Sequence, residues 1–247
     1  MLTMVSVMLP RATVAAKRID EILSTDVSIK DITTNETFNP NLSGVLEFRN
    51  VSFRYPNAEE DVLSNINFTA KPGETTAIIG STGSGKSTLI NLIPRFYDAT
   101  AGSIFLDGVD ITKVKQHALR EKLGFIPQKG VLFAGTIESN INFGNASAPE
   151  EEMKRAARIA QAEEFIDSKP EGYQTPIAQG GTNVSGGQKQ RLSIARAIAR
   201  NPEVYVFDDS FSALDYKTDA TLRKTIKEEI SNSTILIVAQ RKAHYNI

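Results

Sequence analysis

Two short stretches of this sequence contain the residue types that bind phosphate groups and divalent cations. The first reads GSTGSGKST and fits the pattern G-x-x-x-x-G-K-[ST]. Glycines in such a loop let the backbone curl until its N–H groups point at phosphate oxygens, and a helix that begins there adds its positive dipole end. Lys86 would reach the terminal phosphates, and the Ser87 hydroxyl would be offered to Mg²⁺. We therefore predict a nucleotide-binding loop made of Gly80, Ser81, Thr82, Gly83, Ser84, Gly85, Lys86, Ser87 and Thr88.

The second stretch, VYVFDDSFSALD, begins as an apolar run and continues into two adjacent acids, Asp208 and Asp209. A strand with this pattern beside a phosphate loop would place Asp208 to hold Mg²⁺, directly or through water. Asp209 is then the predicted neighbour of the attacking water. Two acids at the end of a strand can also be plain solvated side chains, so this interpretation depends on the phosphate loop.

The elements around these stretches predict an α/β fold. Short β-rich runs precede the phosphate loop and the two acids, and helical spacing follows the loop. Residues 186–201 predict an amphipathic helix whose apolar side is made of Leu192, Ile194, Ala195 and Ile198. Strands that alternate with helices indicate a mainly parallel, doubly wound sheet. The early strands, within 44–55 and 62–70, look antiparallel and predict a separate side layer.

The start of the chain is apolar before it becomes charged. Residues 1–9 read MLTMVSVML, and the positive charges of Arg11, Lys17 and Arg18 follow. A secretory signal carries its positive charge before the apolar run, whereas a membrane helix that emerges into the cytoplasm has the order seen here. We expect residues 1–23 to be the cytoplasmic end of a transmembrane helix, with an ordinary surface helix as the alternative. The polar residues 24–43 predict a linker to a domain at 44–247.

The composition excludes several classes of function. Of 247 residues, 40% are hydrophobic and 23% are charged, which is ordinary for a globular protein. The formal net charge of −1 gives no electrostatic case for nucleic-acid binding. The absence of cysteine excludes disulfides and thiolate metal sites.

A third motif, VSGGQ at Val184 to Gln188, resembles the signature of ATP-binding cassette (ABC) ATPases. The similarity extends from about Gly44 to Gln240, with the motifs in the order expected for the family. It implies a P-loop NTPase (RecA-like) core with a mainly parallel sheet, an antiparallel β subdomain and an α-helical signature subdomain. It also implies that ATP and Mg²⁺ bind between two such domains arranged head to tail. The residues that would then contact the partner's ATP are Ser185, Gly186, Gly187 and Gln188.

Further family positions map onto this sequence individually. Tyr55 matches the aromatic residue that stacks on adenine, although a lone tyrosine is more often a core residue. Gln128 matches the glutamine that contacts Mg²⁺ and water and senses the membrane domain. Ser212 to Asp215, reading SALD, match the loop that crosses the dimer interface. Gln240 stands where the family usually has histidine.

The resemblance further points to the exporter branch of the family. The stretch VLFAGTIESNINFG, after Gln128, is similar to the region of exporter domains that faces the coupling helices of the membrane part. An exporter chain contains both membrane helices and an ATPase domain. The resemblance therefore implies that this domain lies at the cytoplasmic face of the cell membrane. The segment before the signature departs from the exporter pattern, because Gln179 and Gly180 stand where an acid and an arginine are often found. The sequence would then be a C-terminal portion of a half-transporter, truncated relative to the family at Ile247.

Two departures fall in the predicted catalytic machinery. The family usually has glutamate at the position of Asp209, and the aspartate is one methylene shorter, which loses roughly 1.5 Å of reach. Gln240 can form hydrogen bonds but cannot titrate or carry positive charge as histidine does. Both changes affect the site on this chain's own phosphate loop, whereas VSGGQ and SALD, which serve the opposite site, are intact. The pattern resembles the degenerate half of a heterodimeric ABC exporter.

Other functions remain open at this point. A homodimeric exporter with a slow ATPase and an importer ATPase subunit both fit the motifs. Chromosome-maintenance ATPases share the signature but insert long coiled coils, and no sustained heptads occur here. Soluble translation-type ABC proteins normally carry two cassettes in one chain.

Overall fold

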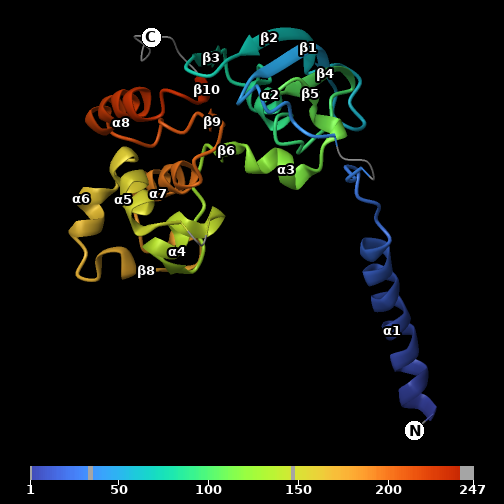
Figure 1. Cartoon of the computed structure of the whole chain (residues 1–247). Coiled ribbons are helices and arrows are strands. Elements are labelled where there is room, and N and C mark those ends of the chain that lie inside the picture. The colour runs from blue at the N-terminus through green and yellow to red at the C-terminus, as the bar shows by residue number, and fades with distance from the viewer. Residues whose placement is uncertain (1, 33–35, 146–147, 240–247) are drawn as a thin grey trace. The chain divides into compact units, whose positions relative to one another are not determined.

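A four-stranded parallel sheet organises the larger of two compact units, Asp31–Ile247. The structure is a computed structural model that describes residues 2–32, 36–145 and 148–239. The sheet order is β3 (Thr75–Ile79), β10 (Thr234–Ala239), β9 (Val204–Asp208) and β6 (Leu123–Ile126), as Figure 1 shows. Parallel strands of this kind are buried on both faces, and all six residues of β10 are buried. The predicted mainly parallel sheet is confirmed.

The predicted antiparallel layer is also confirmed. It has the order β2 (Leu63–Ala70), β1 (Leu46–Phe53), β4 (Ala101–Leu106) and β5 (Val109–Asp110), and each neighbouring pair is antiparallel. A two-stranded sheet pairs β7 (Gly135–Thr136) with β8 (Pro176–Ile177).

Strand β9 separates two hydrophobic cores because its side chains alternate between the faces of the sheet. Val204 and Val206 pack in the core shared with the antiparallel layer, and Tyr205 and Phe207 pack in the core shared with the helices. Both cores therefore fix the strand that ends in the two acids. The first core also includes residues of α2 (Lys86–Asn91) and α3 (Gln116–Glu121).

The helices of the second core follow β6 in the chain. They are α4 (Ile137–Ile141), α5 (Glu150–Ile159), α6 (Glu163–Asp167), α7 (Gly186–Ala199) and α8 (Tyr216–Glu229). The predicted apolar side of α7 is confirmed, since Leu192, Ile194, Ala195 and Ile198 are all buried. Residues 150–167 form two helices rather than one, because Gln161 adopts the left-handed conformation with φ of 56° between α5 and α6. Short 3₁₀ turns complete the unit at Ile111–Lys113, Asn142–Gly144, Gly172–Gln174 and Gln179–Gly181.

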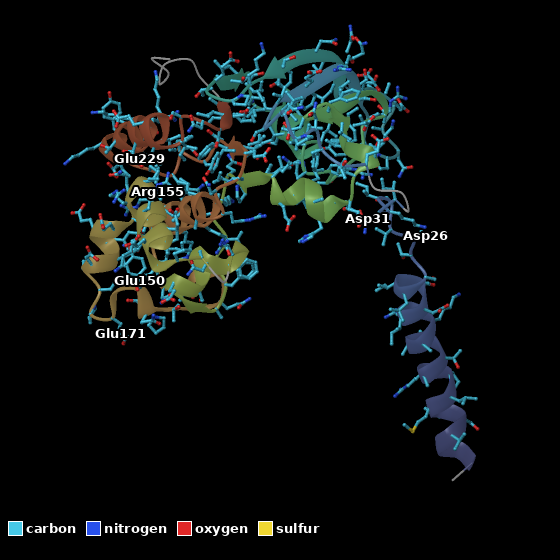
Figure 2. The ribbon with its side chains drawn as sticks, in the orientation of Figure 1. Asp26, Asp31, Glu150, Arg155, Glu171 and Glu229 are labelled. Atoms are coloured by element: carbon cyan, nitrogen blue, oxygen red, sulfur yellow. The ribbon has the colours of Figure 1, made fainter. Side chains whose placement is uncertain are left out.

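Asp31 and Phe38, which precede β1, belong to the larger unit and contact other parts of it. The Asp31 carboxylate, labelled in Figure 2, accepts a 2.9 Å hydrogen bond from the Gln116 backbone N–H at the start of α3, and this bond lowers the pKa of Asp31. The Lys122 ammonium lies 4.9 Å from the centre of the Phe38 ring. The compact unit thus begins inside the segment predicted as a linker, and the domain boundaries stay predictions.

The smaller unit, Met1–Lys30, consists of α1 (Leu2–Leu23) and a short continuation. Its helix contains Pro10, and its described side chains are exposed. Among the described residues, no helix combines the length and the apolarity needed to cross a bilayer. The membrane origin of residues 1–23 stays a prediction.

Candidate functional site: a phosphate loop beside paired carboxylates

The phosphate loop lies between the end of β3 and the start of α2, as predicted. Gly83 and Gly85 have φ of 81° and 85°, a conformation that glycine adopts without the cost other residues incur. A Cβ on Gly80 would lie 2.6 Å from Ser84 Oγ, and a Cβ on Gly85 would lie 3.1 Å from the Val62 side chain. The curled backbone therefore depends on these glycines. The space beside Gly83 is open, because a Cβ there would meet nothing within 4 Å.

The Lys86 ammonium lies against the backbone of this loop. Its ammonium donates to the Gly80 carbonyl at 2.8 Å, to the Ser81 carbonyl at 2.6 Å and to Ser84 Oγ at 3.4 Å. A cation presented inside a curled glycine loop fits a polyphosphate, since the backbone N–H groups and the ammonium would all contact phosphate oxygens.

Asp208 and Ser87 connect the end of β9 to the phosphate loop. Ser87 Oγ donates to Asp208 Oδ1 at 3.0 Å. Burial raises the pKa of Asp208 and the neighbouring Asp209 adds to this, while the Ser87 hydrogen bond and Lys86 act in the opposite direction. The Ser87 hydroxyl and the Asp208 carboxylate are hard oxygen ligands. Mg²⁺ is typically bound by one or two carboxylates together with phosphate oxygens. The residues present therefore fit Mg²⁺.

Asp209 is held by Gln128, from the loop after β6. Gln128 Nε2 donates to Asp209 Oδ2 at 3.2 Å. Asp209 itself has a left-handed backbone with φ of 46°, so β9 turns sharply at this residue. The structure brings Ser87, Gln128, Asp208 and Asp209 together in two hydrogen-bonded pairs; their catalytic and metal-binding roles stay predictions.

Gln240, the second predicted catalytic residue, lies outside the described residues. The strand before it is described up to Ala239, which is paired in register with Ile79, the last residue of β3. On the other side, Val238 pairs with Asp208. The last described residue of β10 is therefore aligned with the entry to the phosphate loop.

Tyr55 contacts the far end of the phosphate motif. Its hydroxyl lies 3.0 Å from Thr88 Oγ1, and its half-buried ring packs edge-on against Phe53 and Tyr97 at centroid distances of 4.8 and 5.3 Å. The residue is thus tied to α2, and its stacking on adenine stays a prediction.

The signature residues form the N-terminus of α7. Ser185 Oγ accepts from the Gln188 N–H at 3.2 Å, and Gln188 Oε1 accepts from the Ser185 N–H at 3.0 Å, which is a reciprocal capping box. Ser185 and Gly186 are exposed, and a Cβ on Gly186 would meet nothing within 4 Å. The helix therefore presents a glycine-lined N-terminus to solvent.

The SALD loop lies beside this N-terminus. A Cβ on Gly187 would lie 3.4 Å from the Ala213 carbonyl oxygen. Ser212 Oγ donates to the Asp209 carbonyl at 2.9 Å, and Asp215 caps α8 through Thr218. Hydrogen bonds from Thr218 lower the pKa of Asp215. The SALD loop thus connects the paired carboxylates, Asp208 and Asp209, to the signature at the N-terminus of α7.

A hollow of about 240 Å³ lies next to the Gln128 loop and was not predicted from the sequence. It is lined by aromatic, aliphatic and basic side chains, among them Phe125, Val131, Phe143, Arg196 and Arg200. Phe143 is 61% exposed and stacks on Phe133 at 4.3 Å. The exposed aromatics in VLFAGTIESNINFG were the available signal, because large apolar side chains at the surface mark interaction sites.

Comparisons with known proteins agree with this geometry. The sequence profile of the family described as "ABC transporter" matches residues 63–212. An ABC transporter ATP-binding protein of Mycobacterium tuberculosis is 45% identical over 244 residues, which cover 98% of this chain and 42% of that protein. An ATP-dependent lipid A-core flippase of Pseudomonas aeruginosa is 43% identical over 201 residues, or 81% of this chain and 33% of the flippase.

The fold is similar to a solved ABC exporter as well. The structure of a bacterial Atm1-family ABC exporter with ATP bound superimposes with a TM-score of 0.86 at 34% identity, over 97% of this chain and 42% of that one. This chain spans less than half the length of the relatives it matches. The chain belongs to the ABC transporter family, as an ATP-binding domain of the type found in ABC exporters.

Proposed function

We propose that this domain binds Mg-ATP on its own phosphate loop, pairs head to tail with a second ABC cassette and powers export of a substrate through attached membrane helices. The observation that carries the proposal is the double link between the phosphate loop, the β9 carboxylates and Gln128. Ser87 donates to Asp208 at 3.0 Å, and Gln128 donates to Asp209 at 3.2 Å.

Each part of this chain has a distinct task in that proposal. The glycine loop and Lys86 bind the phosphates, and Tyr55 stacks on the base. Ser87, Asp208 and Gln128 hold Mg²⁺, which neutralises charge on the phosphate oxygens when it is bound. Asp209 orients or deprotonates the attacking water. Ser185 with Gly186, Gly187 and Gln188 completes the partner's site, and Ser212 and Asp215 lie at the interface.

We further propose that this chain's own site hydrolyses ATP slowly. Asp209 has a shorter side chain than the glutamate usual at this position, and a misplacement of about 1 Å can cost on the order of 100-fold in rate. Its carboxylate is also engaged by Gln128 at 3.2 Å, which restrains how far it can move toward a water. Gln240 supplies no titratable group.

A heterodimer follows from this asymmetry. The cap formed by Ser185 and Gln188 and the cap formed by Asp215 are intact, so this chain lends a complete surface to the other site. We propose a second half-transporter with glutamate and histidine at the two altered positions as its partner. The exposed aromatic hollow beside Gln128 would receive the coupling helices of the membrane part, at the cytoplasmic face of the cell membrane. A homodimeric exporter with a slow ATPase is the second candidate, and it is favoured if the chain pairs with itself when a glutamate-bearing partner is present.

ATP binding by the full chain, with and without Lys86→Ala, tests the proposal. The loss of a charged hydrogen-bond donor should weaken ATP binding by roughly 10- to 100-fold. Lys224→Ala, which removes an exposed lysine on α8, is the control and should leave binding unchanged. Equal ATP affinity for all three proteins would contradict the proposed function.

A further inference from the structure

One buried side chain of α7 holds both sides of the loop that carries Gln128. Gln190 Nε2 donates to the Pro127 carbonyl at 3.1 Å, and Gln190 Oε1 accepts from the Gly130 N–H at 2.8 Å. Gln190 is only 1% exposed. A buried amide that pairs with a donor on one side of Gln128 and an acceptor on the other fixes the loop in register with the helix, because either backbone group left unpaired would cost free energy.

Gly130 shows how closely the loop approaches α7. A Cβ at this position would lie 2.7 Å from the Lys189 carbonyl oxygen and 3.1 Å from the Gln190 Cα. Real Cβ atoms essentially never lie within 3.0 Å of such an atom, so the 2.7 Å approach leaves no room for a side chain. The loop and the helix backbone are therefore in direct contact, and that contact requires glycine.

The same loop is fastened to the carboxylate turn by Ser210, which is fully buried. Ser210 Oγ lies 2.9 Å from the Ile126 carbonyl oxygen and 3.4 Å from the Pro127 carbonyl oxygen. The Pro127 carbonyl thus lies within reach of two buried donors, one on α7 and one directly after Asp209. Figure 1 shows α7, β6 and β9 next to one another in this part of the unit.

Helix α7 begins at the signature and reaches this junction within two turns. Ser185 caps the helix, and Gln190 lies five positions further on, a rise of about 7.5 Å at 1.5 Å per residue. Over so short a distance a hydrogen-bonded helix moves as one body. A displacement of the signature end is therefore carried to Pro127 and Gly130, and through them to Gln128.

We propose that Gln190 is a positioning residue that couples the two ATP sites of the assembled dimer: occupation of the partner's site, at the signature end of α7, changes the position of Gln128 in this chain's own site. The inference rests on the proposed function, in which the signature contacts the partner's ATP. The coupling is reciprocal in binding free energy, so a nucleotide in this chain's site would in turn affect affinity at the other.

A probe beside Gln128 measures this coupling directly. The chain contains no cysteine, and Lys129 is exposed, so Lys129→Cys can be labelled with an environment-sensitive fluorophore. Lys86→Ala is added to weaken ATP binding at this chain's own loop, and ATP is kept below the concentration that fills the weakened site. The labelled full chain is then assembled with a second cassette whose phosphate loop is intact. Fluorescence is recorded against ATP concentration, and bound ATP is counted with a radiolabel.

In this background ATP should change the fluorescence as it fills the partner's site. Gln190→Leu keeps a side chain of similar size but removes both hydrogen bonds. We expect a fluorescence change at least about fivefold smaller at equal ATP occupancy. Gly130→Ala disturbs the same contact from the loop side, so it should have the same effect even if Gln190→Leu does not fold. Gln174→Leu, the same change at an exposed glutamine that pairs with Glu138, should leave the response intact.

The outcomes separate this inference from the proposed function. A full fluorescence response in Gln190→Leu or Gly130→Ala, at unchanged ATP occupancy, would overturn the coupling role. So would a parent dimer that binds ATP without any fluorescence response, and ATP binding itself would then still stand. A dimer with Lys86 intact that binds no ATP at either site would overturn the proposed function and the coupling with it.

Discussion

Ser87 and Asp208 are 121 positions apart in the sequence, and the Ser87 hydroxyl donates a 3.0 Å hydrogen bond to the Asp208 carboxylate. This bond joins the phosphate loop to the end of β9. The parallel register brings the two together, because β10 pairs with both β3 and β9. The site is therefore assembled by the sheet.

The raised pKa of Asp208 predicts that the site is maintained at a cost in stability. Burial disfavours the charged carboxylate, so the folded chain binds the proton more tightly than the unfolded chain. The free energy of unfolding should then fall as pH rises from below the ordinary aspartate pKa through the raised value. Asp208→Asn removes this dependence, and its midpoint of thermal unfolding at pH 7 should be higher than that of the parent chain.

The same variant should lose function while it gains stability. Changes to residues that only support metal ligands cost about 10- to 100-fold in affinity, so loss of Asp208, the carboxylate proposed to bind Mg²⁺, should lower Mg²⁺ affinity by at least roughly 10-fold. Calorimetric titration of Mg-ATP measures the loss of affinity, and denaturation curves at several pH values measure the gain in stability. A destabilised Asp208→Asn chain at pH 7 would contradict the burial cost.

Ser185 caps α7, and its proposed contact with the partner's phosphate can be separated from this capping by two substitutions. Ser185→Ala removes the α7 cap and should destabilise the chain by about 1 kcal/mol. Ser185→Asp keeps a good cap, so stability should be retained, but it places a negative charge where the partner's phosphate would bind. ATPase activity of the assembled dimer should fall at least roughly 100-fold in Ser185→Asp. Normal turnover by this stable variant would show that the signature does not contact phosphate.

Lys122 should matter for stability far more than a surface lysine. Its ammonium donates to Asp107, whose side chain is fully buried, at 2.9 Å, and also pairs with Glu203 at 2.6 Å. Burial acts to lower the pKa of Lys122, but hydrogen bonds with Glu203 and Asp107 outweigh it and the pKa is raised. The contribution to stability should persist until the pH exceeds the ordinary lysine value.

Lys122→Met leaves the Asp107 carboxylate buried without its positively charged partner, which should cost about 3 kcal/mol. Lys113→Met, at an exposed lysine paired with Glu36 at 3.5 Å, should cost less than about 0.5 kcal/mol. Urea unfolding of the two variants measures the difference. Equal costs would show that the Lys122 cluster contributes no more than a surface ion pair.

Local patterns in the sequence predicted the parallel sheet, the antiparallel layer and the position of the glycine loop between β3 and α2. The loop glycines adopt positive φ at Gly83 and Gly85, and the apolar side of α7 is buried as its spacing indicates. Motifs of this kind are local, because the residue types and the backbone conformation are fixed within a few positions.

Contacts between distant residues could not be predicted in the same way. The bonds from Gln190 to Pro127 and Gly130 span 63 and 60 positions, and no local pattern distinguishes Gln190 from a surface glutamine. The break between α5 and α6 at Gln161 has no strong sequence signal, because a left-handed residue other than glycine is uncommon. The Gln128 to Asp209 bond likewise follows from the adjacency of β6 and β9.

The central claim, that this chain's own site is a slow one, is tested by restoring the two usual residues. Asp209→Glu with Gln240→His should raise ATP turnover at this site by roughly 10- to 100-fold when the partner's site has been silenced by mutation. Each single variant should give a smaller gain, and ATP affinity should change little. Single-turnover ATPase rates of the assembled dimer are the measurement. A faster hydrolysis step in the double variant, with little change in ATP affinity, supports a degenerate site, and a rate equal to that of the unaltered chain would contradict it.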